Sequence, residues 1–332
     1  MRVAVTGAAG FLGNNLCRAL LAAGHEVSAL QHERGGALDG IVAPGRLRRV
    51  EGSILDGPSL ESLICFGPQR AEVLVHLAAR ISLAPWRRAE LHTTNVLGTR
   101  NVVEAALEHG TRMIHASSIH ALAALPKDKI LDEASPPADE RQPYYDQSKA
   151  EGEREIARGR ERGLDAVIVN PTAMIGPNDF APSQMGQLFL DLHRGKIPAV
   201  VAGGFVWVDV RDVATQLVRL VEQRPPSPRY LLPGHHATLL DLAAEVAALA
   251  QRAPVRRALP AWLATAMAPF AEGAARLVDR EPALSRASVS VLQHHQQVDG
   301  SLARRELGFQ PRPLGETIAD LLADFAARGV LP

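Results

Sequence analysis

The segment at the start of the chain constrains the fold more than any other feature of the sequence. An apolar run at residues 3–5 leads directly into a turn that carries Gly7, Gly10 and Gly13. A helical pattern follows at once and stops at Gly24. Glycines let the chain turn tightly and let a pyrophosphate approach the backbone, and a helix start offers free N–H groups to phosphates. The sequence therefore predicts a dinucleotide-binding turn at the beginning of a domain.

Composition indicates an ordinary globular chain. The 332 residues are 46% hydrophobic, and 36 basic residues balance 36 acidic ones. Because the net charge is zero, neither nucleic acid nor a membrane is expected as a partner. No apolar run is long enough to span a bilayer, and the first strand begins too early to leave room for a signal peptide. Cys17 and Cys65 lie in apolar helical patterns, so we expect no disulfide, no metal site and a cytoplasmic location.

Short apolar strands alternate with helical patterns through the first half of the chain. This alternation predicts an α/β fold with a Rossmann-type, doubly wound parallel sheet, which binds ligands at the carboxyl ends of its strands. Strands are expected at residues 2–6, 26–30, 47–51, 73–77, 113–117 and 166–170. Helices are expected at residues 10–23, 59–63, 89–109 and 145–162.

The character of the sequence changes after Asn170, where prolines punctuate a loop-rich segment. We expect residues 1–170 to form the dinucleotide-binding domain, with 206–233 returning to it. A smaller, discontinuous C-terminal substrate-binding region is expected to comprise 171–205 and 234–332.

Two hydroxyl-bearing sites point to proton-transfer chemistry. Tyr145 and Lys149 stand four residues apart, so on a helix their side chains share a face. An ammonium group beside a phenol favours the phenolate and lowers the tyrosine pKa, which lets tyrosine exchange a proton near neutral pH. Ser117 and Ser118 end an apolar run, where a serine hydroxyl can hydrogen-bond the same carbonyl oxygen that the tyrosine serves.

These residues belong to an ordered set of motifs that resembles a known family. The motifs are Thr6-Gly-x-x-Gly-x-x-Gly13, His76-Leu-Ala-Ala79, Asn95-Val-x-Gly-Thr99, Ser117-Ser118, Tyr145-x-x-x-Lys149 and Asn170-Pro-Thr172. The chain resembles the extended short-chain dehydrogenase/reductase superfamily (the NAD-dependent epimerase/dehydratase family). Within it, the chain looks most like the bacterial branch related to dihydroflavonol-4-reductase.

The resemblance implies a role for each matching residue. Ser118, Tyr145 and Lys149 would form the catalytic triad, with Tyr145 as proton donor in reduction and Lys149 on the nicotinamide ribose. Asn95 would support the site from its helix. Residues assigned to the cofactor are Gly7, Ala9, Gly10, Phe11, Leu12, Gly13, Leu77, Ala78, Ala79, Pro171 and Thr172.

The end of the second strand bears on the choice between NAD and NADP. An acidic residue there would hold the ribose 2′-OH of NAD, whereas a basic one would accept the 2′-phosphate of NADP. His32 and Arg34 favour NADP(H) over NAD(H), and Glu33 argues the other way if it points inward. Ser53 replaces the aspartate that commonly holds the adenine, so adenine contact is expected at Ser53 and Ile54, with Asp56 as an alternative.

Three functions remain open on this scaffold. The favoured one is NAD(P)H-dependent reduction of a ketone or aldehyde, or oxidation of a secondary alcohol. The second is a nucleotide-sugar epimerase with tightly held NAD, and the third is a non-catalytic nucleotide sensor. Dehydratases of the superfamily typically carry an acid pair where this chain has Ser118 and Ile119, which argues against elimination chemistry.

The substrate is expected to be a small-molecule carbonyl or alcohol held by loops above the sheet. The tentative contacts are Ile119, His120, Met174 and Trp207, and further wall candidates include Tyr144, Phe180 and Phe189. The resemblance also allows a homodimer through the helices at 89–109 and 145–162.

Overall fold

The computed structural model describes residues 1–32, 36–125, 129–279, 281–282, 284–294 and 296–331. Its centre is a seven-stranded parallel sheet in the spatial order β12-β8-β7-β6-β1-β2-β3. The strands are β1 (Arg2–Thr6), β2 (Glu26–Gln31), β3 (Leu47–Glu51), β6 (Val73–His76), β7 (Arg112–Ala116), β8 (Ala166–Pro171) and β12 (Arg229–Leu232). The predicted Rossmann-type fold is therefore confirmed.

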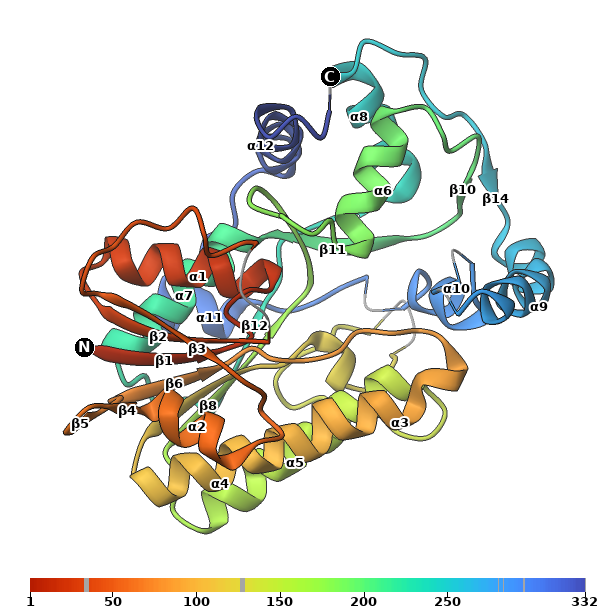
Figure 1. Ribbon diagram of the computed structural model, residues 1–332. Helices are drawn as coiled ribbons and strands as arrows, with labels where there is room; N and C mark the ends of the chain where they lie inside the picture. Colours follow the sequence, from red (N-terminus) through yellow and green to blue (C-terminus); the bar gives the residue numbers. More distant parts are fainter. Residues whose placement is uncertain (33–35, 126–128, 280, 283, 295, 332) are drawn as a thin grey trace.

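Helices cover both faces of this sheet (Figure 1). Every residue of β6 and β7 is buried, as parallel strands require when helices lie above and below them. One face packs against α1 (Phe11–Ala22), α7 (Val210–Glu222) and α11 (Ser301–Leu307). The other packs against α2 (Gly57–Ile64), α4 (Gly98–His109) and α5 (Tyr144–Glu161).

The strand order reverses direction at β1, which lies between β2 and β6. The chain builds the β2–β3 side first and then crosses to β6 on the opposite side of β1. In open α/β sheets, the crevice beyond the carboxyl ends of the strands at such a reversal is where ligands bind. The glycine turn follows β1 directly, so the topology places it at this crevice.

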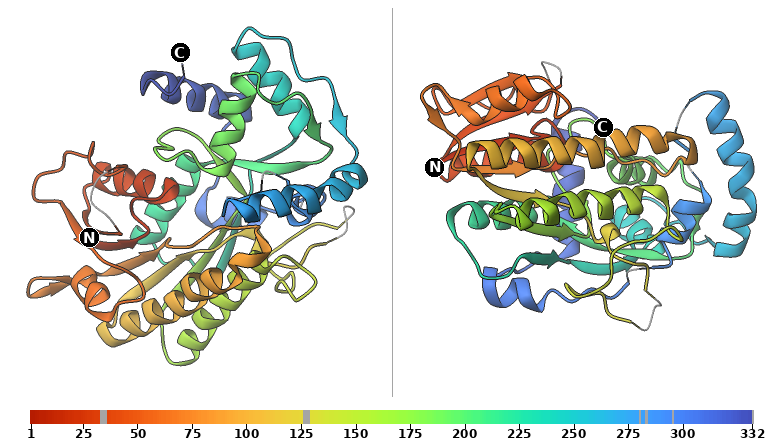
Figure 2. Two further views of the ribbon diagram at one scale, coloured as in Figure 1. Left: turned by 45° about the vertical axis from the view of Figure 1, so that its right-hand side comes forward. Right: turned by 90° about the horizontal axis from the view of Figure 1, so that it is seen from below.

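A smaller lobe sits beside the carboxyl edge of the sheet (Figure 2). It contains a three-stranded sheet in the order β13-β11-β9, made of β13 (His235–Thr238), β11 (Gly204–Asp209) and β9 (Ala173–Ile175). Its core draws on three helices, α6 (Gln184–His193), α8 (Leu239–Leu249) and α12 (Leu314–Ala327). The fully buried rings of Phe189 and Trp207 meet edge to face with centroids 6.0 Å apart.

The two lobes interleave in sequence at slightly different points from those expected. Residues 206–209 belong to β11 of the smaller sheet, so the chain re-enters the first lobe only at α7. The helix α11 also belongs to the first lobe, although it falls within the predicted 234–332 substrate-binding region. Ala303, Leu307 and Phe309 are buried in the same core as α1 and α7, which is why this late segment packs there.

Several short elements lie outside the sequence prediction. Cys65 begins a two-stranded hairpin of β4 (Cys65–Phe66) and β5 (Gln69–Arg70) instead of lying in a helix, whereas Cys17 is buried in α1. The remaining elements are η1 (Pro85–Arg87), α3 (Arg88–Leu91), η2 (His92–Leu97), η3 (Ile119–Ala121), β10 (Val200–Val201), β14 (Ala258–Leu259), α9 (Ala261–Leu277) and α10 (Arg286–Val291).

Within the described ranges, no helix combines the length and the hydrophobicity that a membrane crossing requires.

Candidate active site

The glycine turn forms a cradle of bare backbone between β1 and α1. Gly7 has a φ of 67°, in the region that glycine favours. A Cβ on Gly13 would lie 2.0 Å from the Gly7 carbonyl oxygen, and one on Gly7 would lie 2.7 Å from the Ala78 backbone nitrogen. Gly10 is the N-cap of α1 and has no side chain to cap the first N–H groups. These groups therefore remain available to an anion, as a bound pyrophosphate needs.

A buried histidine holds the end of β6 against this cradle. Thr99 donates its hydroxyl hydrogen to the Asn95 carbonyl, so its oxygen accepts from His76 Nε2 at 3.0 Å. His76 Nδ1 must then accept from the Thr6 hydroxyl at 2.7 Å, which leaves the Thr6 oxygen to accept from the backbone N–H groups of Leu77 and Ala78. Burial lowers the pKa of His76 to about 3, in keeping with this neutral tautomer.

The predicted adenine and ribose contacts lie at the far end of the crevice. His32 is exposed immediately after β2, and Arg34 lies outside the described residues, as does Glu33. Ile54 is buried and Ser53 half-buried on the loop after β3. Asp56 instead caps α2, accepting hydrogen bonds from the Ser59 N–H at 2.9 Å and the Ser59 hydroxyl at 2.5 Å.

The three predicted catalytic residues come together at the carboxyl edge of the sheet. Ser118 follows β7, and its side chain caps η3 by accepting from the His120 N–H at 3.2 Å. Tyr145 lies in the first turn of α5, and Lys149 lies one turn further along the same face. Both side chains are buried, and the Ser118 hydroxyl lies near enough to the phenol of Tyr145 to lower the pKa of that phenol.

The electrostatics of Tyr145 differ from the sequence prediction. Burial raises the pKa of its phenol above the ordinary range, and the Asp146 carboxylate raises it further, whereas the hydrogen bond to Ser118 lowers it. The predicted lowering of the tyrosine pKa by Lys149 is thus wrong for this structure. Burial lowers the pKa of Lys149 itself to about 8, an effect that the Glu153 carboxylate opposes. Burial is thus the largest cause of the pKa shift of both groups, in place of the attraction between Tyr145 and Lys149 that their spacing suggested.

A buried polar network anchors the backbone of Ser118. Asn170 donates one amide hydrogen to the Ser118 carbonyl and the other to the Glu153 carboxylate, both at 2.7 Å. Arg229 completes the network by donating to the Glu153 carboxylate at 2.5 Å and to the side-chain amide oxygen of Asn170 at 3.1 Å. Sequence analysis missed Glu153 and Arg229. A signal existed for Glu153, because it stands four residues after Lys149 on the same helix face.

Asn95 joins the segments around it through three hydrogen bonds, one of them between two helices. Its amide pairs with both the N–H and the carbonyl of Arg80, at 2.8 and 2.9 Å, and donates to the Ser148 hydroxyl at 2.9 Å. Asn95 lies in η2, a π-helical turn between α3 and α4 where the sequence predicts one regular helix. The amide thus ties the loop after β6 to α5, beside Lys149.

The tentative substrate contacts fall into two groups. Ile119 and His120 form η3 directly after Ser118; His120 Nδ1 lies 3.4 Å from the Asp146 carboxylate, and its ring lies 5.9 Å from the Tyr145 ring. Met174 is half-buried in β9. Trp207 departs from the expectation, because it is fully buried and its indole N–H donates to the Ala237 carbonyl at 3.2 Å.

Three further wall candidates also lie away from the triad. Phe189 is a core residue of the smaller lobe, and Phe180 is sandwiched between the guanidinium groups of Arg18 and Arg328. The hydroxyl of Tyr144 lies 3.1 Å from His92 Nδ1. The aromatic pattern in the sequence therefore marked packing at these positions, not the substrate wall.

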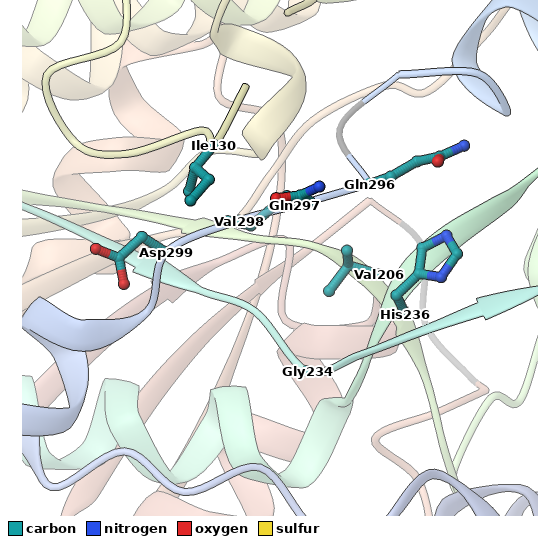
Figure 3. A pocket seen from close by; sticks show the side chains of 8 residues that line it. All are labelled: Ile130, Val206, Gly234, His236, Gln296, Gln297, Val298 and Asp299. Atoms are coloured by element: carbon teal, nitrogen blue, oxygen red, sulfur yellow. The ribbon is translucent and has the colours of Figure 1, made fainter. Parts of the chain in front are cut away.

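A cavity of about 500 Å³ is lined by residues from β11, β13 and the segments around Ile130 and Val298 (Figure 3). Its lining includes Val206, His236 and Asp299, and it contains none of the triad residues. Val298 lines it and also packs in the apolar cluster that includes Ile119. The cavity is thus a neighbour of the catalytic cleft and not part of it.

The cleft fits a dinucleotide on the evidence of its own residues. The glycine cradle has no room for side chains, and the start of α1 is uncapped. Ser117, Thr172 and Gln31 each bury a side-chain oxygen that finds no hydrogen-bond partner among the described residues. Each follows or ends a strand at the carboxyl edge, where a bound ligand would supply the partner. Pro171 ends β8 immediately before Thr172.

Comparison with known sequences decides the family. A sequence model described as NAD dependent epimerase/dehydratase family matches residues 3–232. The chain belongs to this family. It is thus an extended short-chain dehydrogenase/reductase, and the motifs that pointed to this superfamily lie within or beside the matched segment.

Curated relatives of the family align over nearly the whole chain. The chain is 33% identical to the sterol demethylase protein B of Methylococcus capsulatus, over 100% of both chains. It is 31% identical to a putative dihydroflavonol 4-reductase of Synechocystis, covering 98% of this chain and 94% of that one. A ketoreductase of Stigmatella aurantiaca that is named for a farnesyl dihydroquinoline oxide is 30% identical, over 100% and 99%.

Solved structures agree with this assignment. The crystal structure titled gox2253 superposes with a TM-score of 0.83 at 30% identity, covering 100% of this chain and 99% of that one. The Bordetella bronchiseptica enzyme WbmH, solved with NAD+, gives a TM-score of 0.78 at 23% identity over 99% of both chains, which shows a shared fold.

We predict that Arg229→Met destabilises the protein by about 3 kcal/mol, because it leaves the buried Glu153 carboxylate without its cationic partner. Arg224→Met is the matched control: its pair with Asp165, at 3.1 Å, is exposed. The control should cost less than about 1 kcal/mol in denaturant unfolding. Equal losses in the two variants would show that the Glu153 pair has no special weight.

We also predict that His76 makes stability depend on pH. Its pKa is about 3 in the folded state and 6.5 ordinarily, so the unfolded chain binds more protons between these values. Stability is therefore full above pH 6.5 and falls as the pH drops toward 3, by about 1.4 kcal/mol per pH unit. His76→Gln should flatten this slope in thermal unfolding, with the remainder carried by His115, whose pKa burial also lowers. An unchanged slope would contradict the assignment.

Proposed function

We propose that this protein is an NAD(P)-dependent oxidoreductase that reduces a ketone or aldehyde, or oxidises the corresponding secondary alcohol. The observation that carries the proposal is the convergence of the Ser118 hydroxyl, at the end of β7, on the buried Tyr145 phenol, with Lys149 one helical turn away. Such a pair can serve one carbonyl oxygen from two sides. The full-length similarity to reductases supports the same conclusion.

In this proposal, Tyr145 delivers the proton to the substrate oxygen during reduction. Burial keeps the phenol protonated at neutral pH, so the group begins the reaction in the form that a donor needs. The Ser118 hydroxyl donates a second hydrogen bond, which stabilises negative charge that develops on the same oxygen. The bound nicotinamide supplies the hydride.

The remaining groups hold these two hydroxyls and the cofactor in place. Lys149 would bind the nicotinamide ribose, and Pro171 and Thr172 would lie against the nicotinamide. The glycine turn would hold the pyrophosphate, with Leu77, Ala78 and Ala79 lining the groove beside it. Asn170 donates to the Ser118 carbonyl and so holds the backbone from which the serine hydroxyl projects.

We further propose that the substrate is bulky and largely apolar. Two of the tentative contacts, Ile119 directly after Ser118 and Met174 in β9, are apolar side chains, and His120 is the polar one beside them. The printed names of two full-length relatives refer to a sterol and to a farnesylated ring system. A nucleotide sugar would require more polar partners, so the epimerase alternative is the weaker one.

Replacing the proton donor should test the reaction directly. Tyr145→Phe is expected to lower kcat/KM by at least about a hundredfold in NAD(P)H oxidation at 340 nm with a panel of ketones and aldehydes. Tyr144→Phe is the matched control, since the Tyr144 hydroxyl lies 3.1 Å from His92 Nδ1 instead of beside Ser118, and it should retain activity. Equal activity of Tyr145→Phe and wild type would exclude the proposed role. No net oxidation with any carbonyl would favour the epimerase.

Cofactor choice has its own test. We propose a preference for NADP(H), carried by His32 and Arg34 at the end of β2. Titration of the protein with both reduced nucleotides, followed by fluorescence, should give tighter binding of NADPH. Arg34→Ala should weaken NADPH binding by about tenfold, the loss of one charge-assisted contact, and leave NADH binding nearly unchanged. Tighter binding of NADH by the wild type would reverse the preference.

A further inference from the structure

The helix α9 carries its large apolar side chains on the outside. Trp262 is 72% exposed, Phe270 82% and Leu277 89%, whereas Ala264 and Ala268 on the opposite side are fully buried. A surface helix of a globular protein normally turns its large apolar residues inward. In α9 this arrangement is inverted, so the packing of the folded chain does not account for the large side chains.

The exposed residues form one continuous stripe. Trp262, Ala266, Phe270, Gly273 and Leu277 follow one another at intervals of three or four residues, the spacing that places side chains on a single helix face. All five are exposed. The stripe therefore presents an uninterrupted apolar surface along the length of the helix, with an indole near one end.

Basic residues frame this stripe, while nearby acidic residues are engaged elsewhere. Arg256 and Arg257 precede α9, Arg276 lies in its last turn, and all three are exposed without an ion-pair partner among the described residues. The neighbouring acids are satisfied: Glu272 accepts the Arg286 N–H at 2.9 Å, and Asp279 pairs with Arg87 at 2.8 Å.

The helix α9 lies beside the carboxyl edge of the central sheet. In Figures 1 and 2, α9 lies at the margin of the molecule, on the side toward which the strands of the central sheet point. The pair of Arg87 and Asp279 connects the end of α9 to η1, in the segment that follows the cofactor-side loop after β6. The helix that carries the apolar stripe thus lies on the same side of the molecule as the catalytic edge.

We propose that α9 docks the protein on the surface of an anionic lipid bilayer. Tryptophan and phenylalanine on one face of a helix, with arginines beside them, suit the boundary between acyl chains and headgroups. The three unpaired arginines complement anionic headgroups. Pairing of two α9 helices in a dimer is less favourable, because it brings these basic ends together whether the helices run parallel or antiparallel.

The zero net charge of the chain argues against a membrane partner only as an average over all residues. The charge balance hides a local group of unpaired arginines beside one apolar face. The inference rests on the exposure of α9 and goes beyond the proposed reaction. A vesicle assay can therefore support it even if no carbonyl is reduced.

Vesicle sedimentation tests the proposal with the full chain. The wild type should pellet with phosphatidylcholine vesicles that contain phosphatidylglycerol, and much less with phosphatidylcholine alone. Phe270→Glu should weaken this binding by at least about tenfold. Val42→Glu is the matched control, since Val42 is 87% exposed in the first lobe, and it should bind like the wild type. Arg276→Gln should weaken binding about fivefold, whereas Arg154→Gln on α5 should not.

Tryptophan fluorescence provides a second measurement that does not depend on sedimentation. Trp207 is fully buried and Trp86 is half-buried, so a blue shift on addition of anionic vesicles would come from Trp262 and should disappear in Trp262→Phe. Equal thermal unfolding of Phe270→Glu and wild type would verify that the variant folds.

Three results would overturn the proposal. The first is no binding of the wild type to either vesicle. The second is equal loss of binding in Phe270→Glu and Val42→Glu. The third is a dimer in light scattering that Phe270→Glu converts to a monomer, which would show that a second copy covers the stripe.

Discussion

The contact between the glycine turn and the end of β6 is the constraint on which the cofactor site depends. The backbone of Gly7 approaches that of Ala78 so closely that no Cβ fits between them. The carboxyl ends of the parallel strands β1 and β6 therefore lie side by side. The hydrogen bond of 2.7 Å between Thr6 and His76 fixes how far the two strands are shifted along each other. Any side chain at Gly7 would separate β1 from β6 at the place where the pyrophosphate is expected.

Much of the first lobe could be predicted from sequence because its signals are local. The strand at residues 2–6 agrees with β1 to the residue, and β3 agrees likewise. Short buried strands and amphipathic helices in alternation permit few other arrangements. The placement of the three proposed catalytic residues could be predicted for the same reason, since Tyr145 and Lys149 are one helical turn apart and Ser118 follows a recognisable strand, whereas their roles came from the family resemblance.

The features that the sequence did not reveal depend on contacts between distant residues. Arg229 reaches Glu153 across 76 positions, and no local pattern links them. Trp207 was expected to contact the substrate. Its strand β11 instead pairs with β9 and β13, and the indole is buried in the core of the smaller lobe. The direction of the Tyr145 pKa also depends on burial, which spacing alone does not report.

The π-helical turn η2 also has a consequence for the register of the long helix that contains it. One turn of this kind holds an extra residue relative to a regular α-helix. Removing a single position between His92 and Leu97 would restore regular winding and would leave α3 and α4 in nearly their present relative rotation, because the extra residue is taken up within one wider turn. The Asn95 amide spans that junction, bonded to Arg80 on one side and Ser148 on the other. A one-residue deletion there would therefore keep the faces of α3 and α4 and change chiefly the wide turn that presents the Asn95 amide to both partners.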